Sequence, residues 1–316
     1  MSLNAALQPA PFDLARADGP TEGHAVWLWT ADGVRIRAAV WAGGKKGTVV
    51  LLPGRTEYVE KYGRAAADLL ARGYSVVSLD WRGQGLAARA LADPMKGHVV
   101  DFDEYQRDLD ALLGLVAKEG LPQPLMLLSH SMGGCIALRA LHRDLGFKAS
   151  VFSAPMWGIV IPWYKRLTAR LLVRYADELR MTERFVPSTS RKSNVLDVAF
   201  TGNPLTNDAQ MWDYMVAQLR EEPKLGLGGP SVAWLRAALR ECAALMSMPA
   251  PNVPALTCVG ARERVVKPMP IYQRMDDWPK GELEVYPSAL HEIMMEGPEL
   301  RKAFFDSAVS LFDKHR

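Results

Sequence analysis

The sequence is poor in cysteine. Only three occur among 316 residues, and no two of them form a Cys-x-x-Cys pair. This sparse, odd number argues against both a disulfide framework and a zinc knuckle, and it is typical of a reducing compartment. Because 49% of the residues are hydrophobic, a chain of this length can bury a large core without disulfide bonds.

The sequence also lacks a membrane-spanning run and a secretory signal. Two uncharged stretches, 120–138 and 242–261, approach the length of a membrane span, but prolines and polar residues interrupt both. We therefore interpret them as buried strands and loops. The first 20 residues have no basic residue before Arg16 and carry prolines where the apolar core of a signal should run. These absences predict a cytoplasmic protein.

Neither sign of charge dominates the chain. The 38 Lys and Arg residues nearly balance the 35 Asp and Glu residues, which leaves a net charge of +3. The two signs are interspersed along most of the sequence. This balance gives no support to nucleic-acid binding.

Apolar runs alternate with helical patterns along the first half of the sequence. A hairpin is predicted over 24–41, where an Asp-Gly turn separates two β-branched and aromatic runs. Short apolar strands and helices then alternate, which is the pattern of a mainly parallel sheet covered on both faces. We expect strands at 48–52, 75–80, 125–130 and 149–154, and helices at 61–72, 105–118 and 132–142.

This alternation stops after residue 155. It resumes with predicted strands at 254–260 and 282–286, followed by a final amphipathic helix. We therefore predict an α/β core formed by residues 1–155 and 249–316, with a helical cap formed by residues 156–248.

The chemistry is expected at the sequence Ser-His-Ser-Met-Gly-Gly, residues 129–134. A predicted strand ends there and a helix begins at once, which is the context that a nucleophile elbow requires. In such an elbow a strained turn exposes the nucleophile, here Ser131. Small residues two places before and after it, Ser129 and Gly133, let strand and helix approach each other. Ser129 replaces the usual first glycine, and the alternative is a glycine-rich connection with an incidental serine.

A serine hydroxyl at neutral pH needs a general base, almost always an imidazole. Elimination among the six histidines leaves His291, in the loop after the strand 282–286. The other five lie in a predicted strand or helix, before or beside the nucleophile, or near the chain end. His130 adjoins Ser131 and is expected to point to the sheet side of the elbow. The alternative for His291 is a surface histidine without a role.

The imidazole in turn needs a carboxylate to orient it. Glu263, in the loop after the strand 254–260, is the candidate, and the chain order of serine, acid and histidine is the one expected for such an elbow. Glutamate is longer than the commoner aspartate by one methylene, so its side chain must fold back to reach the ring. Asp276 and Asp277 are the alternative carboxylates.

Acyl transfer also needs N–H donors where the oxyanion forms. One is expected to be the backbone N–H of Met132, directly after the nucleophile. The other is expected from Arg55, where Gly54 permits a tight turn after the strand 48–52. The alternative is an ordinary Pro-Gly turn.

Seven motifs occur in order between residues 51 and 301: PGRTEYVEKY (53–62), DWRGQGLA (80–87), LADPMKGHV (91–99), SHSMGG (129–134), SAPMWGI (153–159), GGPSVAWLRAA (228–238) and ALHEIMMEGPELR (289–301). With them the chain resembles the α/β-hydrolase superfamily and, within it, the PldB-type lysophospholipases of Gram-negative bacteria, close to the monoacylglycerol lipases. The resemblance implies an α/β-hydrolase fold with a helical cap and a triad of Ser131, Glu263 and His291. Pro53 stands where the monoacylglycerol lipases have a histidine, which favours the lysophospholipase branch.

The predicted cap combines apolar and basic residues. One face of a predicted helix carries Leu167, Leu171, Leu172 and Tyr175. Between residues 161 and 192, eight basic residues stand against three acidic ones. Such a segment suits the surface of an anionic membrane or a phosphate headgroup. The alternative is that the apolar face packs on the core and the charges form a solvated outer face.

These observations predict a serine hydrolase that cleaves the carboxyl ester of a single-chain lipid through an acyl-enzyme, in particular a lysophospholipase. The alternatives are a monoacylglycerol lipase, a broad-specificity carboxylesterase or a non-catalytic binding protein with a hydrolase fold. No metal or organic cofactor is required. Peripheral contact with the inner membrane is expected through the cap. Substrate contacts are expected from Gly54, Met156, Trp157 and Trp163.

Overall fold

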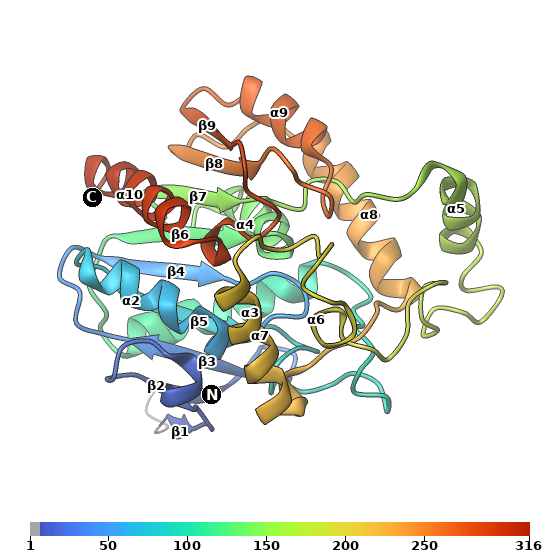
Figure 1. Cartoon of the computed structure of the whole chain (residues 1–316), viewed down its shortest axis with the longest axis horizontal. Coiled ribbons are helices and arrows are strands. Elements are labelled where there is room, and N and C mark those ends of the chain that lie inside the picture. Colours follow the sequence, from blue (N-terminus) through green and yellow to red (C-terminus); the bar gives the residue numbers. More distant parts are fainter. Residues whose placement is uncertain (1–6) are drawn as a thin grey trace.

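A nine-stranded sheet runs through the middle of the protein in a computed structural model that describes residues 7–316 (Figure 1). The strands follow the order β1-β2-β3-β5-β4-β6-β7-β8-β9 across the sheet. The first three neighbouring pairs are antiparallel and the five from β5 onward are parallel, so the predicted mostly parallel sheet is confirmed. The strands are β1 Gln8–Pro9, β2 His24–Trp29, β3 Arg35–Trp41, β4 Thr48–Leu52, β5 Ser75–Asp80, β6 Leu125–His130, β7 Ala149–Ser153, β8 Ala255–Gly260 and β9 Gly281–Tyr286.

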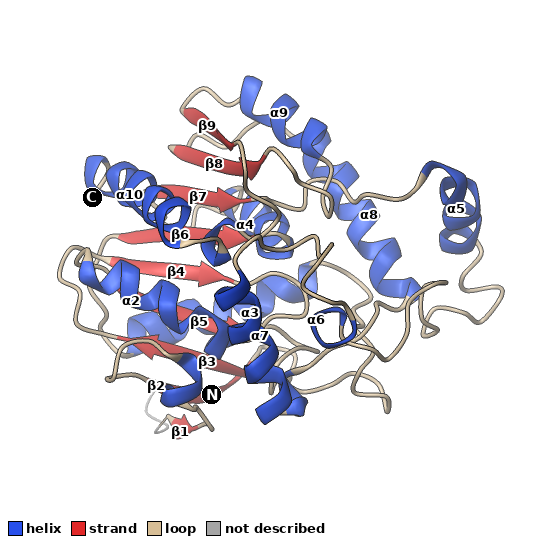
Figure 2. Cartoon of the chain, viewed as in Figure 1, coloured by secondary structure: helices blue, strands red, loops and turns tan. Residues whose placement is uncertain are grey.

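Helices cover both faces of the sheet (Figure 2). Every residue of β4, β5 and β7 is buried, which explains why these strands are mainly apolar and show no alternation of apolar and exposed polar residues. One core cluster packs against α3 Asp103–Lys118, α4 Met132–Leu141, α8 Val232–Ser247 and α9 Pro268–Asp276. The other packs against α2 Gly63–Ala71, α7 Ala209–Glu221 and α10 Pro298–Lys314.

The segment predicted as the cap contributes no strand to this sheet within the described part of the chain. It contains α5 Arg166–Arg174 and α6 Asn194–Asp197, as well as α7 and α8. Figure 1 shows α5 standing away from the sheet, at the far end of a long loop. By contrast α8 packs into the core through Trp234 and Leu245, among others. The cap boundaries at 156 and 248 therefore stay a prediction.

The remaining helices are short. They are α1 Leu14–Ala17 and the 3₁₀ helices η1 Val59–Tyr62, η2 Trp163–Lys165, η3 Pro223–Leu225 and η4 Ile293–Met295.

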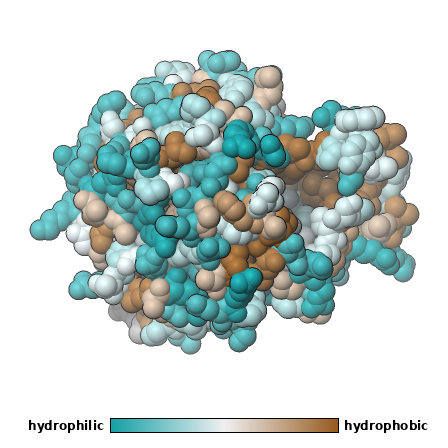
Figure 3. Space-filling view, in the orientation of Figure 1, coloured by the Kyte–Doolittle hydropathy of each residue, from teal (hydrophilic) through white to brown (hydrophobic). Residues whose placement is uncertain are grey.

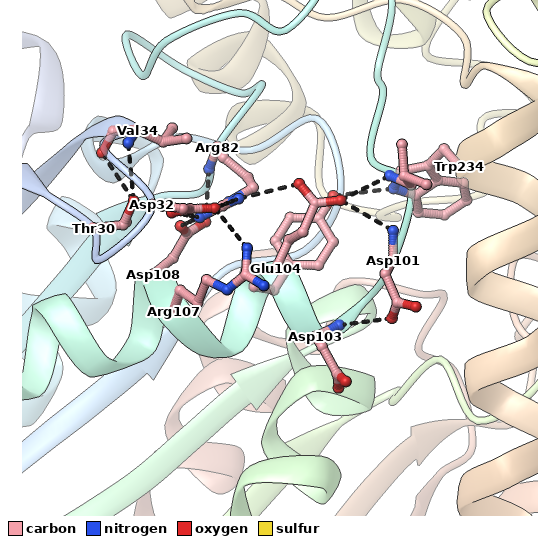
Figure 4. Close-up of polar contacts among 12 residues, drawn as sticks. Thr30, Asp32, Val34, Arg82, Asp101, Asp103, Glu104, Arg107, Asp108 and Trp234 are labelled. Atoms are coloured by element: carbon pink, nitrogen blue, oxygen red, sulfur yellow. Dashed lines mark hydrogen bonds and ion pairs between the residues drawn. The ribbon is translucent and has the colours of Figure 1, made fainter.

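An ion-pair network holds the loop between β5 and α3 (Figure 4). The guanidinium of Arg82 binds Asp32 in the β2–β3 turn and Asp108 and Glu104 on α3, at 2.8 to 3.1 Å. The second oxygen of Glu104 accepts hydrogen bonds from the backbone N–H groups of residues 100 and 101. Because Arg82 and Asp108 are buried, these contacts fix both ends of the loop.

Candidate active site

Ser131 lies in a strained turn between β6 and α4. Its φ of 49° is a backbone conformation that residues other than glycine rarely adopt, as expected for a nucleophile elbow. A Cβ atom on Gly133 would lie 2.2 Å from the carbonyl oxygen of Leu52, so only glycine lets α4 approach β4 here. Ser129, in place of the usual glycine, is buried and donates its hydroxyl to the carbonyl of Val151 at 3.3 Å. The predicted strand-turn-helix context is confirmed.

His291 reaches Ser131 from the loop after β9. Its Nε2 lies 2.9 Å from the Oγ of Ser131, and its Nδ1 lies 2.7 Å from the Oε2 of Glu263. The three residues come from loops after β6, β8 and β9, which meet at the carboxyl edge of the parallel strands. The hydroxyl, the imidazole and the carboxylate thus form one hydrogen-bonded line.

The carboxylate oxygen of Glu263 that does not face His291 also has hydrogen-bond partners. Its other oxygen, Oε1, accepts hydrogen bonds from the backbone N–H groups of Val265 and Val266 at 2.6 and 3.1 Å. Burial alone would raise the pKa of Glu263, but His291 and the two amides outweigh it and hold that pKa below its usual value. The longer glutamate is therefore folded back by its own loop. The alternative carboxylates, Asp276 and Asp277, lie exposed at the end of α9.

The two predicted oxyanion donors lie beside this line. Met132 begins α4 directly after Ser131, and Arg55 follows the turn at Gly54. The N–H of Gly54 donates to Glu57 and its carbonyl accepts from Gln84, so this loop is held from both sides. Within residues 7–316, neither the N–H of Arg55 nor that of Met132 donates to another protein group. Their role as oxyanion donors stays a prediction.

A cavity of about 400 Å³ opens at Ser131 and His291. Most of the side chains around it are apolar, which is typical of a small-molecule site. They include Met156, Ile159, Val195, Val198, Leu205, Trp212, Met215, Leu219, Trp234, Val265 and Val266. Of the four predicted substrate contacts, only Met156 lines this cavity.

The expected contacts from two tryptophans and Gly54 need correction. Trp157 is buried in the core, where its ring packs against Phe152 and Trp278 and its N–H donates to the carbonyl of Gly134. Trp163 is 79% exposed on the surface of the predicted cap. Gly54 does not line the cavity, and its N–H donates to the carboxylate of Glu57. An aromatic-rich stretch does not reveal which side chains point inward, because that depends on how the segment packs.

Sequence reasoning missed a buried charged cluster in the cavity wall. The ammonium of Lys61 lies 2.6 Å from a carboxylate oxygen of Glu57 and 2.5 Å from one of Glu292. The i, i+4 spacing of Glu57 and Lys61, and the position of Glu292 next to His291, were the available signals. We name Glu57, Lys61, His130 and Glu292 the buried cluster.

His130 belongs to this cluster and lines the cavity, so the expectation that it points to the sheet side of the elbow is wrong. Its ring centroid lies 4.8 Å from that of His291, and its Nδ1 lies 3.1 Å from the carbonyl of Ser153. Burial lowers the pKa of His130 to about 3, so this ring stays neutral at neutral pH. Burial would raise the pKa of Glu57, but the Lys61 ammonium and the hydrogen bond from the Tyr62 hydroxyl outweigh it and lower that pKa to about 2.

The same cluster offers the donor set for a metal ion. Donor atoms of Glu57, His130 and Glu292 lie within 4.8 Å of one another. However, the Lys61 ammonium already binds both carboxylates. A cationic group, the Lys61 ammonium, therefore already lies between the two carboxylates.

A nucleophile elbow and a Ser-His-Glu line at the edge of a mainly parallel sheet define the α/β hydrolases. Residues 43–298 match the model of the family described as serine aminopeptidase, S33, and the chain belongs to this family. This confirms the fold and the family that the sequence predicts.

Similar proteins indicate which kind of reaction this α/β hydrolase catalyses. Lysophospholipase L2 of Escherichia coli is 31% identical over 282 residues, which cover 84% of this chain and 80% of that protein. A monoacylglycerol lipase of Mycolicibacterium smegmatis is 28% identical over 90% of this chain and 94% of its own length. Among solved structures, a monoglyceride lipase of Saccharomyces cerevisiae superimposes with a TM-score of 0.73 at 20% identity, over 98% of this chain and all of that one. The chain thus falls among the carboxylic ester hydrolases.

Proposed function

We propose that the protein is a lysophospholipase, which cleaves the carboxyl ester of a single-chain phospholipid. One observation carries the proposal: the hydrogen-bonded line of Ser131, His291 and Glu263 opens into a mainly apolar cavity of about 400 Å³. An apolar cavity suits an acyl chain, and the line of three supplies the nucleophile. The similarity to lysophospholipase L2 favours this substrate class.

In the proposed mechanism the Oγ of Ser131 attacks the ester carbonyl while His291 takes its proton. Glu263 holds the imidazole in the tautomer with a proton on Nδ1. The N–H groups of Arg55 and Met132 stabilise the oxyanion. His291 then returns the proton to the leaving glycerol oxygen, and water, activated by the same imidazole, releases the fatty acid from the acyl-enzyme.

Matched substrates test the proposal. We expect the purified protein to hydrolyse lysophosphatidylethanolamine with a kcat/KM at least roughly 10-fold above that for a monoacylglycerol with the same acyl chain, since a bound headgroup adds contacts. Initial rates of fatty-acid release from both lipids measure this. Equal rates would instead identify a monoacylglycerol lipase or a general carboxylesterase. A lack of both hydrolysis and labelling by a fluorophosphonate would identify a binding protein.

We propose further that the protein contacts an anionic membrane peripherally through α5 and the residues around it. Leu167 is 68% exposed and Leu171 is 49% exposed, so the alternative in which this apolar face packs on the core does not hold for them. The hydrophobic side chains of this part are visible at the right of Figure 3. The basic residues Lys165, Arg166, Arg170 and Arg174 lie on the same short segment. Exposed leucines beside basic side chains suit the interface of an anionic bilayer.

No helix among residues 7–316 is long and apolar enough to cross a membrane. Contact would therefore be made by insertion of side chains at the lipid surface.

Replacing both exposed leucines tests the membrane proposal. We expect the Leu167→Ser, Leu171→Ser double variant to bind phosphatidylserine-rich vesicles at least roughly 10-fold more weakly, because it loses two apolar side chains that bilayer contact would bury. Co-sedimentation with vesicles measures the binding. Val100→Ser is the matched control, because Val100 is also exposed but lies outside the cap. Unchanged binding of the double variant would refute contact through α5.

A further inference from the structure

Arg55 is a cation in the cavity wall without an acidic partner. Its guanidinium donates from Nη2 to the carbonyl of Gly228 at 2.7 Å and lies 5.1 Å from the ring centroid of Trp234. Its Nε is buried without a hydrogen-bond partner. Within residues 7–316, Arg55 forms no ion pair and its Nη1 donates no hydrogen bond to the protein. A half-buried guanidinium with free donors is costly unless something else completes it.

Lys61, which also lines the cavity, has acidic partners, unlike Arg55. Its ammonium forms ion pairs with two carboxylates, those of Glu57 and Glu292, at 2.6 and 2.5 Å. Burial lowers the pKa of Arg55 to about 10. Arg55 therefore stays protonated at neutral pH. One side of the cavity thus holds a cation with two carboxylate partners, and the other holds Arg55, which has no carboxylate partner among residues 7–316.

The guanidinium of Arg55 packs against a stretch of backbone that is itself held by hydrogen bonds. It packs directly against the backbone of Gly97, where a Cβ atom would lie 2.7 Å from Nη2. Gly97 in turn bonds to the start of α8, since its N–H donates to the carbonyl of Gly229 and its carbonyl accepts from the N–H of Ser231. The loop that carries Gly97 is held by the Arg82 network of Figure 4. The positive charge is therefore held in place before any substrate binds.

We infer that the Arg55 guanidinium binds the phosphate group of the lysophospholipid and so selects phospholipid over neutral glyceride. The inference rests on the proposed function, since it names the part of the substrate that Arg55 would hold. Guanidinium donors match phosphate oxygens in geometry and charge. The same residue would then serve twice, with its backbone N–H at the oxyanion and its side chain at the headgroup.

Two substitutions and two lipids test the inference. We expect Arg55→Gln to lower kcat/KM for lysophosphatidylethanolamine roughly 10- to 100-fold more than for the matched monoacylglycerol, mainly through KM, since charge-assisted bonds to phosphate are lost. The comparison between lipids removes any effect on the oxyanion donor, because the backbone N–H remains. Arg55→Lys keeps the charge and should recover most of the selectivity.

Arg89→Gln is the matched control. Arg89 is also half-buried, binds the carbonyls of Gly85 and Lys224, and has its pKa lowered by burial, but it lies outside the cavity. We expect its loss to affect both lipids equally. Glycerophosphoethanolamine, the deacylated product, gives a second measurement: it should inhibit the wild type competitively and inhibit Arg55→Gln much less.

The outcomes separate this inference from the proposed function. If the wild type hydrolyses lysophospholipid preferentially and Arg55→Gln keeps that preference, the inference is wrong and the proposed function stands. Equal losses on both lipids with a lowered melting temperature would show that Arg55 only clamps Gly228 and Trp234, which also overturns the inference. If the wild type hydrolyses neither lipid, the proposed function itself fails.

Discussion

The Ser131→Ala variant is expected to lose ester hydrolysis almost completely, with kcat lowered by roughly 10⁴- to 10⁶-fold. The hydroxyl 2.9 Å from the Nε2 of His291 is the proposed nucleophile, and alanine leaves the imidazole with nothing to activate. Fatty-acid release and covalent labelling by a fluorophosphonate both measure the loss. Alanine at this position has the same backbone strain as serine, so the melting temperature should change little.

Ser288→Ala is the control for this prediction. Ser288 is exposed in the loop that carries His291, but it has no place in the hydrogen-bonded line. Its variant should hydrolyse and label like the wild type. Should Ser131→Ala still label at the wild-type rate, another nucleophile would have to carry the chemistry.

The sheet and the nucleophile turn were predictable because both are local patterns. Buried parallel strands such as β4 and β5 are short, mainly apolar segments, and the elbow needs small residues at fixed spacing. The two-residue strand β1 could not be found this way. It contains Gln8 and Pro9, has no apolar pattern, and exists only because its backbone pairs with β2.

The surroundings of the site were harder to predict. Lys61 and Glu292 are 231 residues apart in the chain, and charged side chains are usually exposed, so nothing local indicates that they form a buried pair. Trp157 and Trp163 occur in one aromatic stretch, yet one lies in the core and the other on the surface. A cavity wall is assembled from segments distant in sequence, which explains why only Met156 of the four predicted substrate contacts lines the cavity.

The contacts of Glu263 explain how a glutamate can hold the imidazole of His291 in place. If the site needed only a carboxylate near His291, Glu292 could take the place of Glu263. Glu292, however, is already bound to Lys61 in the buried cluster, whereas Glu263 has one oxygen on His291 and the other on two backbone amides. The site thus contains two acids next to one histidine, and their partners separate their roles.

Glu263→Gln is therefore expected to lower kcat by roughly 10³- to 10⁴-fold. Its carbonyl oxygen can keep the two amide bonds from Val265 and Val266, which turns the NH₂ group toward the Nδ1 of His291. A donor there favours the tautomer with the proton on Nε2, which cannot accept the proton of Ser131. Steady-state hydrolysis and the rate of fluorophosphonate labelling should fall together, while the melting temperature stays near that of the wild type.

Two further variants decide whether Glu263 acts by position as well as by charge. Glu263→Asp keeps the carboxylate but is one methylene shorter, so the loop amides would hold it away from the ring and its kcat should lie between those of the wild type and Glu263→Gln. Asp277→Asn removes the alternative carboxylate, which is exposed at the end of α9, and should leave kcat unchanged. A large loss in Asp277→Asn with full activity in Glu263→Gln would reverse the assignment. Equal activity of Glu263→Gln and Glu263→Asp would show that the negative charge on this residue does not orient His291.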